Sequence, residues 1–175
     1  GRALDGTRWL PVPKPAGRTW TDWMGNLHAH DGWTSWLKRH VLNSQEEWVV
    51  WLNRTAERFL ELAPPSAEEV AGARRAQRDL NERLSGTSFI HCNVSTALEF
   101  TLFGCHCGLE RFCYLWYDHR EVVLRWFAAV EKRELRNIAL NADLAVSPFA
   151  MLYSDIASKA KLMFSRQMLS EMGFF

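Results

Sequence analysis

The sequence predicts a parallel α/β fold, and three observations point to it. Two short apolar runs, residues 88–94 and 148–154, have the length and composition of buried strands. A long run with helical periodicity, near residues 119–140, separates them. Helical patterns also precede the first run and follow the second, an order typical of parallel sheets. We expect the two runs to be parallel strands of one sheet, joined through the helix by a right-handed crossover.

The first 42 residues differ from the rest of the chain. They contain five Trp and three Pro, with no helical period. Aromatic and polar residues alternate between Gly and Pro, which predicts short strands in a meander. We assign residues 1–42, an irregular Trp-rich meander, to the same domain as residues 43–175.

The helices are predicted from their start and stop signals. Ser44 with Glu47, and Ser66 with Glu69, form capping-box patterns, and the acidic pairs behind each serine suit a helix N-terminus better than catalysis. An apolar stretch at residues 96–116, broken by two glycines, predicts a helix, a turn and a second helix. We expect two further N-caps, at Asp118 and Ser165.

Composition narrows the classes of partner. The 20 acidic and 21 basic residues give a net charge of +1, so no electrostatic argument favours nucleic acid or a membrane surface. The apolar runs are too short to span a membrane, and no signal-peptide pattern occurs at the N-terminus. Four Cys between residues 92 and 113 suit reduced thiols better than a disulfide scaffold. We therefore expect a cytoplasmic protein; the expectation of a small-molecule substrate comes instead from a family resemblance.

Two short motifs contain metal-ligating residue types. The His28-Ala-His30-Asp31 sequence resembles the His-x-His at the first strand of metal-dependent amidohydrolase barrels, a site that needs further ligands from later strands. We interpret it as a pair of loop histidines. The Cys105-His106-Cys107 sequence lacks the Cys-x2-Cys spacing of structural zinc sites. The sequence therefore predicts free thiols and no metal ligand in this chain.

Polar residues mark the ends of the two predicted strands. Asp155 follows the second strand beside Ser154, and His91 and Asn93 lie in the first strand. Ligands of parallel α/β folds collect at the carboxyl ends of the strands. We predict that Asp155 and Asn93 face a common cavity; the alternative is that Asp155 caps a turn.

Four segments carry a family resemblance through their order and spacing. They are Asp-Trp-Met-Gly at residues 22–25, His-Val-Leu-Asn-Ser-Gln-Glu-Glu-Trp at 40–48, the helical stretch 96–118, and the run from Tyr153 to Leu169. Together they resemble the uroporphyrinogen-decarboxylase-like family. This resemblance implies part of a (β/α)8 barrel (a TIM barrel), because a complete barrel takes about 250 residues. It also implies a catalytic residue, Asp155, and substrate-binding residues near the barrel top: Asn93, His91, Glu99 and Ser154.

The family contains porphyrinogen decarboxylases and methyltransferases that use a corrinoid or a thiol. Phe100 lies near the position of a decarboxylase tyrosine, so the resemblance favours methyl transfer, with a porphyrinogen-type carboxy-lyase as the alternative. Zinc, a corrinoid and a corrinoid protein partner would belong to the complete protein. An alternative of another class is a non-catalytic fragment or subunit that needs a partner to complete the barrel. Such a fragment would self-associate through an exposed apolar face, with side chains such as Trp126, Phe149 and Phe164.

Overall fold

The structure is a computed structural model that describes residues 17–84, 92–147, 150–153 and 161–174. Its elements, in chain order, are β1 (Thr19–Thr21), β2 (Leu27–His30), β3 (Ser35–Arg39), α1 (Gln45–Leu60), α2 (Ala67–Arg83), β4 (Cys92–Ser95), α3 (Ala97–Glu99), the π-helical turn η1 (Phe100–Gly104), α4 (Leu109–Asp118), α5 (Arg120–Asn141), β5 (Ala150–Tyr153) and α6 (Arg166–Glu171). None of the helices in these ranges combines the length and the apolar character needed to cross a membrane.

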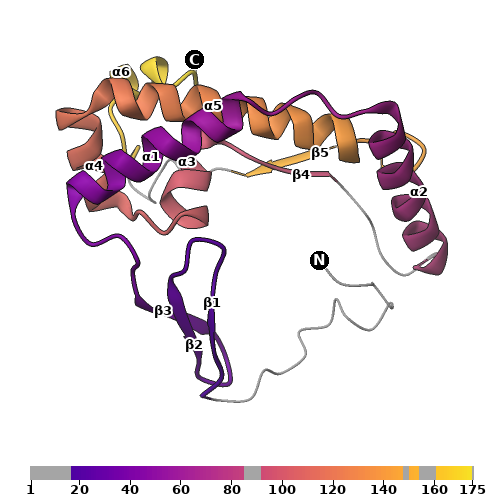
Figure 1. The fold of residues 1–175 in the computed structure, drawn as a ribbon, viewed down its shortest axis with the longest axis horizontal. Helices are drawn as coiled ribbons and strands as arrows, with labels where there is room; N and C mark the ends of the chain where they lie inside the picture. Colours follow the sequence, from indigo (N-terminus) through magenta and orange to yellow (C-terminus); the bar gives the residue numbers. More distant parts are fainter. Residues whose placement is uncertain (1–16, 85–91, 148–149, 154–160, 175) are drawn as a thin grey trace.

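The predicted meander of short strands is confirmed for residues 17–42, and residues 1–16 of the prediction lie outside the described residues. Strands β1, β2 and β3 pair antiparallel in that order, and Figure 1 shows them on one side of the helices. The turn between β2 and β3 is fixed by Asp31, whose carboxylate accepts hydrogen bonds from the backbone of Trp33 and Thr34 and from the indole of Trp36. Alternation of polar and apolar residues, with a Gly in the turn, therefore predicted this sheet correctly.

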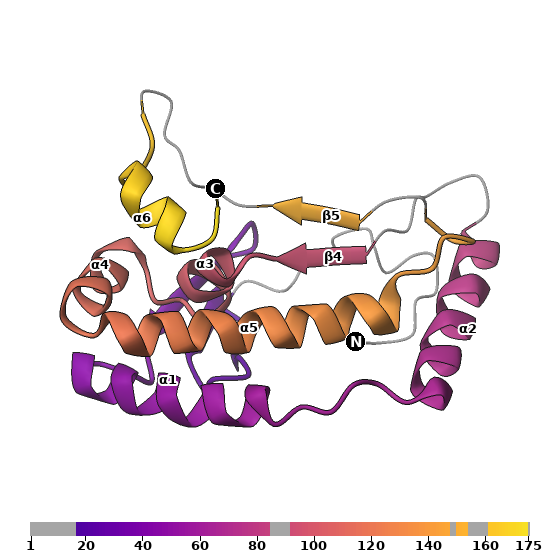
Figure 2. The same cartoon turned by 90° about the horizontal axis from the view of Figure 1, so that it is seen from above.

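The core lies among the helices. Helix α1 lies along α5 (Figure 2), and α4 and η1 pack against the same helix. Trp48, Leu52, Phe112 and Trp126 are fully buried in this core. Because aromatic rings remove large apolar areas from water, these side chains supply much of the driving force for packing the layer.

The predicted parallel pair is also confirmed. Strands β4 and β5 pair parallel from Cys92 opposite Ala150 to Ser95 opposite Tyr153. Helices α4 and α5 lie between them in the chain, and β4 contacts α5 through the amide of Asn137, which donates to the Asn93 carbonyl at 3.3 Å.

The predicted barrel is wrong. The described residues form a three-stranded antiparallel sheet and a separate two-stranded parallel sheet, whereas a TIM barrel closes eight parallel strands on themselves. The predicted exposure of Trp126 and Phe164 is wrong as well, because both are buried against neighbouring helices and loops. Phe149 lies outside the described residues. Packing within the described residues therefore covers Trp126 and Phe164.

The helix caps agree with the sequence with one exception. Both capping boxes form, and Ser165 accepts from the Met168 amide as an N-cap. Asp118, however, is the last residue of α4, and the break before α5 falls at His119, which has no side-chain cap. The Asp118 carboxylate accepts instead from the Gln45 side chain at 2.9 Å. A contact between distant segments thus decides the role of Asp118.

Candidate metal centre

The site predicted from the strand ends is only partly within the described residues. Asp155, Ser154 and His91 lie outside them. Asn93 is exposed on β4, and Glu99 ends the short helix α3, where its amide donates to Thr96 Oγ1. A groove of about 670 Å³ lies beside the carboxyl end of β4, and neither Asn93 nor Glu99 lines it. These two predicted residues are therefore not part of the groove at the carboxyl end of β4.

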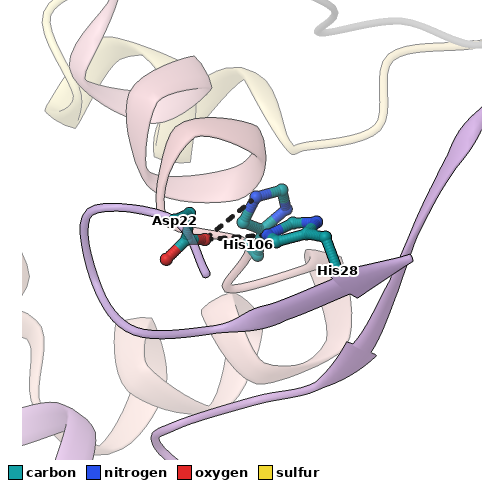
Figure 3. A group of neighbouring side chains, drawn as sticks. All are labelled: Asp22, His28 and His106. Carbon is teal, nitrogen blue, oxygen red and sulfur yellow. Dashed lines mark hydrogen bonds and ion pairs between the residues drawn. The ribbon is translucent and has the colours of Figure 1, made fainter. Parts of the chain in front are cut away.

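A different group of side chains converges elsewhere. Asp22 follows β1, His28 lies on β2, and His106 lies between η1 and α4. One ligand atom from each lies within 4.8 Å of the others, and Figure 3 shows both imidazoles directed at the carboxylate. His28 Nε2 is 3.0 Å from Asp22 Oδ2, and His106 Nε2 is 3.6 Å from the same oxygen. We call these three residues the Asp22 cluster.

Asp22 is held by the turn that it begins. Its Oδ1 atom accepts from the backbone amides of Met24 at 2.9 Å and Asn26 at 3.0 Å, and its Oδ2 atom accepts from the Asn26 side chain at 2.9 Å. The turn requires Gly25, whose φ of 96° is a left-handed conformation that favours glycine. An Asp at the start of such a turn commonly bonds the backbone two residues later. Oδ1 is therefore used by the turn, and Oδ2 faces the histidines.

His28 is positioned by the antiparallel sheet. It pairs with Trp20 across β1 and β2, and the two rings stack with centroids 5.4 Å apart and an interplanar angle of 12°. A register irregularity between Leu27 and His28 disrupts the pairing of β2 with β3 at this point. Bulges of this kind redirect side chains and are frequent beside functional sites.

His106 is positioned by an unusual stretch of backbone. The π-helical turn η1 ends just before it, with the Cys105 amide donating to the Phe100 carbonyl at 2.8 Å. His106 has a φ of 55° and is the one non-glycine residue with positive φ in the part of the chain that the structure describes. Single π-turns are frequent at functional sites, and left-handed non-glycine residues are held there by surrounding contacts.

The meander and the π-turn are joined at the cluster. Trp23, the residue after Asp22, donates its indole N–H to the Gly104 carbonyl at 3.3 Å. Its ring also contacts Phe100 and Trp51, with centroids 5.9 Å and 5.7 Å apart. These contacts bring Asp22 and His28 of the meander against His106 of the helical layer.

The protonation states of Asp22 and His106 are compatible with metal binding. Burial raises the pKa of Asp22, but the hydrogen bonds from His28 and Asn26 outweigh it and bring the pKa to about 2. Burial lowers the pKa of His106, and His28 lowers it further. Metal ligands must be deprotonated carboxylates and neutral imidazoles. At neutral pH, therefore, Asp22 is ionised and His106 is neutral.

The two cysteines beside His106 do not share this property. Cys105 and Cys107 are buried, and burial raises the pKa of both thiols, that of Cys107 to about 12. A thiolate, not a thiol, is the nucleophile and the metal ligand. All four cysteines of the chain are free, as the sequence predicted. Both thiols are therefore neutral at neutral pH and pack in the core as small apolar side chains on either side of His106.

The spacings of both histidine nitrogens from Asp22 Oδ2 are compatible with a single ion. Around an ion with ligands at about 2.1 Å, neighbouring ligand atoms lie about 3.0 Å apart in an octahedron and about 3.4 Å apart in a tetrahedron. The distances of 3.0 Å and 3.6 Å from Asp22 Oδ2 are close to these values. The side chains of Asp22 and His28 are 13% and 9% exposed and that of His106 is 34% exposed, so the cluster is open towards the solvent beside His106.

The sequence contained signals for this cluster but did not connect them. His28 and His106 belong to the two motifs with metal-ligating residue types, and Asp22 begins the Asp-Trp-Met-Gly segment. Each motif alone has too few ligands, and only the folded chain joins them. Comparisons with known protein families, curated proteins and solved structures found no match, so the family resemblance stays a prediction from the sequence.

Proposed function

We propose that this chain binds a divalent transition-metal ion of the zinc type through Asp22 Oδ2, His28 Nε2 and His106 Nε2. The observation that carries the proposal is the convergence of these three atoms, from three separate segments, within 4.8 Å. Imidazole nitrogen and carboxylate oxygen are common zinc ligands, and two His with one carboxylate also hold non-haem iron.

The proposed coordination is of the catalytic kind. Structural zinc sites are closed by four protein ligands, whereas catalytic sites have three and keep a position for water or substrate. The cluster has three ligands and is open beside His106, its most exposed member. A metal at such a site supplies a water of lowered pKa and polarises a substrate oxygen, so hydrolysis is the reaction class that we propose.

Methyl transfer and decarboxylation have less support from the geometry. Both expectations followed from the family resemblance, which also implied a barrel that the described residues do not form. Two of the residues expected to bind the substrate, Asn93 and Glu99, do not line the groove beside the carboxyl end of β4. The Asp22 cluster, by contrast, presents its ligand atoms together.

The proposal is tested by metal titration of protein stripped with EDTA. Calorimetry with Zn²⁺ should show one equivalent bound, and the Co²⁺ form should show the visible absorption of a site with nitrogen and oxygen ligands. Loss of a residue that only hydrogen-bonds to a metal ligand weakens metal binding by roughly 10- to 100-fold. His28→Gln and His106→Gln each remove a ligand and should therefore weaken Zn²⁺ binding by more than this. The matched control is His30→Gln, on the same strand and equally buried but hydrogen-bonded to Ser35.

The outcomes separate the proposal from its alternatives. The proposed ligands are supported if His30→Gln retains its affinity for Zn²⁺ while His28→Gln and His106→Gln lose theirs. Absence of stoichiometric binding in the wild-type protein, or equal loss in all three variants, contradicts them. Circular dichroism of each variant shows whether a loss of affinity reflects a loss of fold.

A further inference from the structure

We infer that the groove beside the carboxyl end of β4 is a binding site for a small apolar molecule that carries one protonated amine. No residue of the Asp22 cluster lines this groove, so the site is separate from the proposed metal centre. Three observations support this class of ligand: the position of the groove, its apolar walls, and the sign of the charges in its lining.

The groove lies at the end of the parallel strand pair. Its volume of about 670 Å³ is within the roughly 300 to 1,000 Å³ of small-molecule pockets. Strands β4 and β5 pair parallel, and Figure 2 shows both arrowheads pointing towards the side where α3 and α6 lie. The lining comes from residues 94–98, one face of α5, Leu152 of β5 and the C-terminal end of α6. Ligands of α/β sheets bind outside the carboxyl ends of the strands, as this groove would allow.

The walls of the groove are apolar side chains, some of which remain in contact with water. On α5, Leu124, Phe127 and Leu135 recur at helical spacing along the face that lines the groove. Leu135 is 59% exposed, and Leu152 from β5 is 61% exposed. Apolar side chains that line one cavity are stabilised when a ligand removes them from water, so the groove favours a molecule with an apolar body.

The charged side chains of the lining are all acidic. Glu131 and Glu134 lie one turn apart on the apolar face of α5, and Glu171 ends α6. None of the described residues that line the groove is a Lys, Arg or His. Two of the carboxylates are paired with arginines from outside the lining, Glu134 with Arg133 and Glu171 with Arg120. One negative charge, that of Glu131, is therefore left uncompensated in the groove.

Glu131 is the carboxylate available to a ligand. Its side chain forms no ion pair or hydrogen bond with another described residue. Phe127, Ala128 and Leu135 are its neighbours at helical spacing on the face that lines the groove. An ammonium group has three N–H donors and no acceptor, so it matches a carboxylate beside apolar surface. A neutral head group would leave Glu131 unpaired, and an anionic head group would be repelled by it.

The test uses the full chain and three probes with the same apolar chain and different head groups: decylamine, decanol and decanoate. Each probe is titrated at neutral pH below the concentration at which it forms micelles, and binding is followed by heteronuclear NMR. Decylamine should cause saturable shifts at residues 94–98 and 171–174, which line the groove. Its Kd should be about threefold to fivefold lower than that of decanol, the effect of one partly exposed ion pair, and decanoate should bind most weakly.

Two substitutions on α5 test the charge and the groove separately. Glu131→Gln should abolish the preference for decylamine over decanol and should leave the affinity for decanol within about twofold. Ala128→Trp, at an exposed position of the lining, should fill the groove and weaken binding of both probes by about tenfold or more. The matched controls are Glu121→Gln and Ala139→Trp, which change exposed residues of the same helix outside the lining.

The site is supported if decylamine binds most tightly and this preference is lost in Glu131→Gln but kept in Glu121→Gln. Equal affinity for the three probes, or a preference that Glu131→Gln retains, overturns the assignment of a cationic ligand. Absence of shifts at the lining residues overturns the site itself. Shifts of the same residues on raising the protein concentration without a probe would assign the groove to a second copy of the chain and also overturn it. Circular dichroism shows whether each variant is folded, and Glu131→Gln alone decides the result if Ala128→Trp is not.

Discussion

Asp22→Ala is expected to destabilise the protein even without metal. The carboxylate accepts two backbone and two side-chain hydrogen bonds, and its removal leaves Asn26, which is 1% exposed, without its acceptor. Lowering the pKa of Asp22 from 3.8 to about 2 corresponds to about 2 kcal/mol of folding free energy contributed by the ionised carboxylate. Allowance for solvent screening reduces this contribution to about 1 to 2 kcal/mol. The buried amide left unpaired adds about 1 to 3 kcal/mol.

The pH dependence of this loss follows from the direction of the shift. Because the folded-state pKa of Asp22 is depressed, its ionisation stabilises the protein fully above pH 3.8 and loses that effect as the pH falls through about 2. The difference between wild type and Asp22→Ala should therefore be about 2 to 5 kcal/mol at neutral pH and should shrink by about 1 to 2 kcal/mol between pH 4 and pH 2.

Urea denaturation in EDTA, followed by circular dichroism at several pH values, measures this difference. Asp79→Ala, which removes an exposed acid on α2, is the control and should change stability by no more than about 0.5 kcal/mol. A loss in Asp22→Ala as small as that of the control, or one that does not vary with pH, would refute the assignment of Asp22 as the hydrogen-bonded centre of its turn.

Three further predictions concern the scaffold around the cluster. Thr101→Val removes the hydroxyl that accepts from the buried Trp126 indole at 2.8 Å, and urea titration should show a loss of about 1 to 3 kcal/mol; a neutral result would mean that the indole finds another partner. Ser44→Ala removes the capping box at the start of α1 and should lower the free energy of unfolding by about 1 kcal/mol in the same assay; an unchanged free energy would mean that this cap does not stabilise the helix. Cys105 and Cys107, whose thiol pKa values are raised by burial, should not react with Ellman's reagent at pH 8 until urea is added; rapid labelling of the native protein would contradict their burial.

The sequence predicted the local elements of this fold well. Ser44, Ser66 and Ser165 each lie at a helix start, because an N-cap is decided by a few neighbouring residues. The parallel pairing of β4 with β5 was predicted from their apolar runs and the long helix between them. The prediction of a barrel was wrong because barrel closure depends on how many strands pair with one another. It also depends on which elements cover side chains such as Trp126. A local sequence pattern contains neither kind of information.

The Asp22 cluster could not be assembled from the sequence for related reasons. The left-handed φ of His106 follows from the π-turn before it, and no residue pattern in that stretch predicts such a turn. The approach of Asp22 depends on Trp23 contacting Gly104, a pairing of residues far apart in the chain. Spacing rules for metal motifs detect ligands that lie close together in the sequence. They therefore miss a site that combines Asp22 and His28 of the meander with His106 of the helical layer.

The placement of the three ligands also predicts that metal binding and folding are coupled. Asp22 and His28 belong to the meander and His106 to the helical layer, so an ion bound by all three would connect the two parts (Figure 3). A ligand that binds only the folded state stabilises it by about 2.7 kcal/mol at a free concentration 100 times its Kd. Zn²⁺ should therefore raise the Tm of the wild-type protein. His106→Gln, which retains Asp22 and His28 on the meander, should lose most of this rise, and His30→Gln should keep it. If Zn²⁺ raised the Tm of the wild type, His106→Gln and His30→Gln equally, the metal would be bound elsewhere on the chain. The reason is that an ion connecting the meander to the helical layer needs His106, whereas an ion bound to one part alone does not.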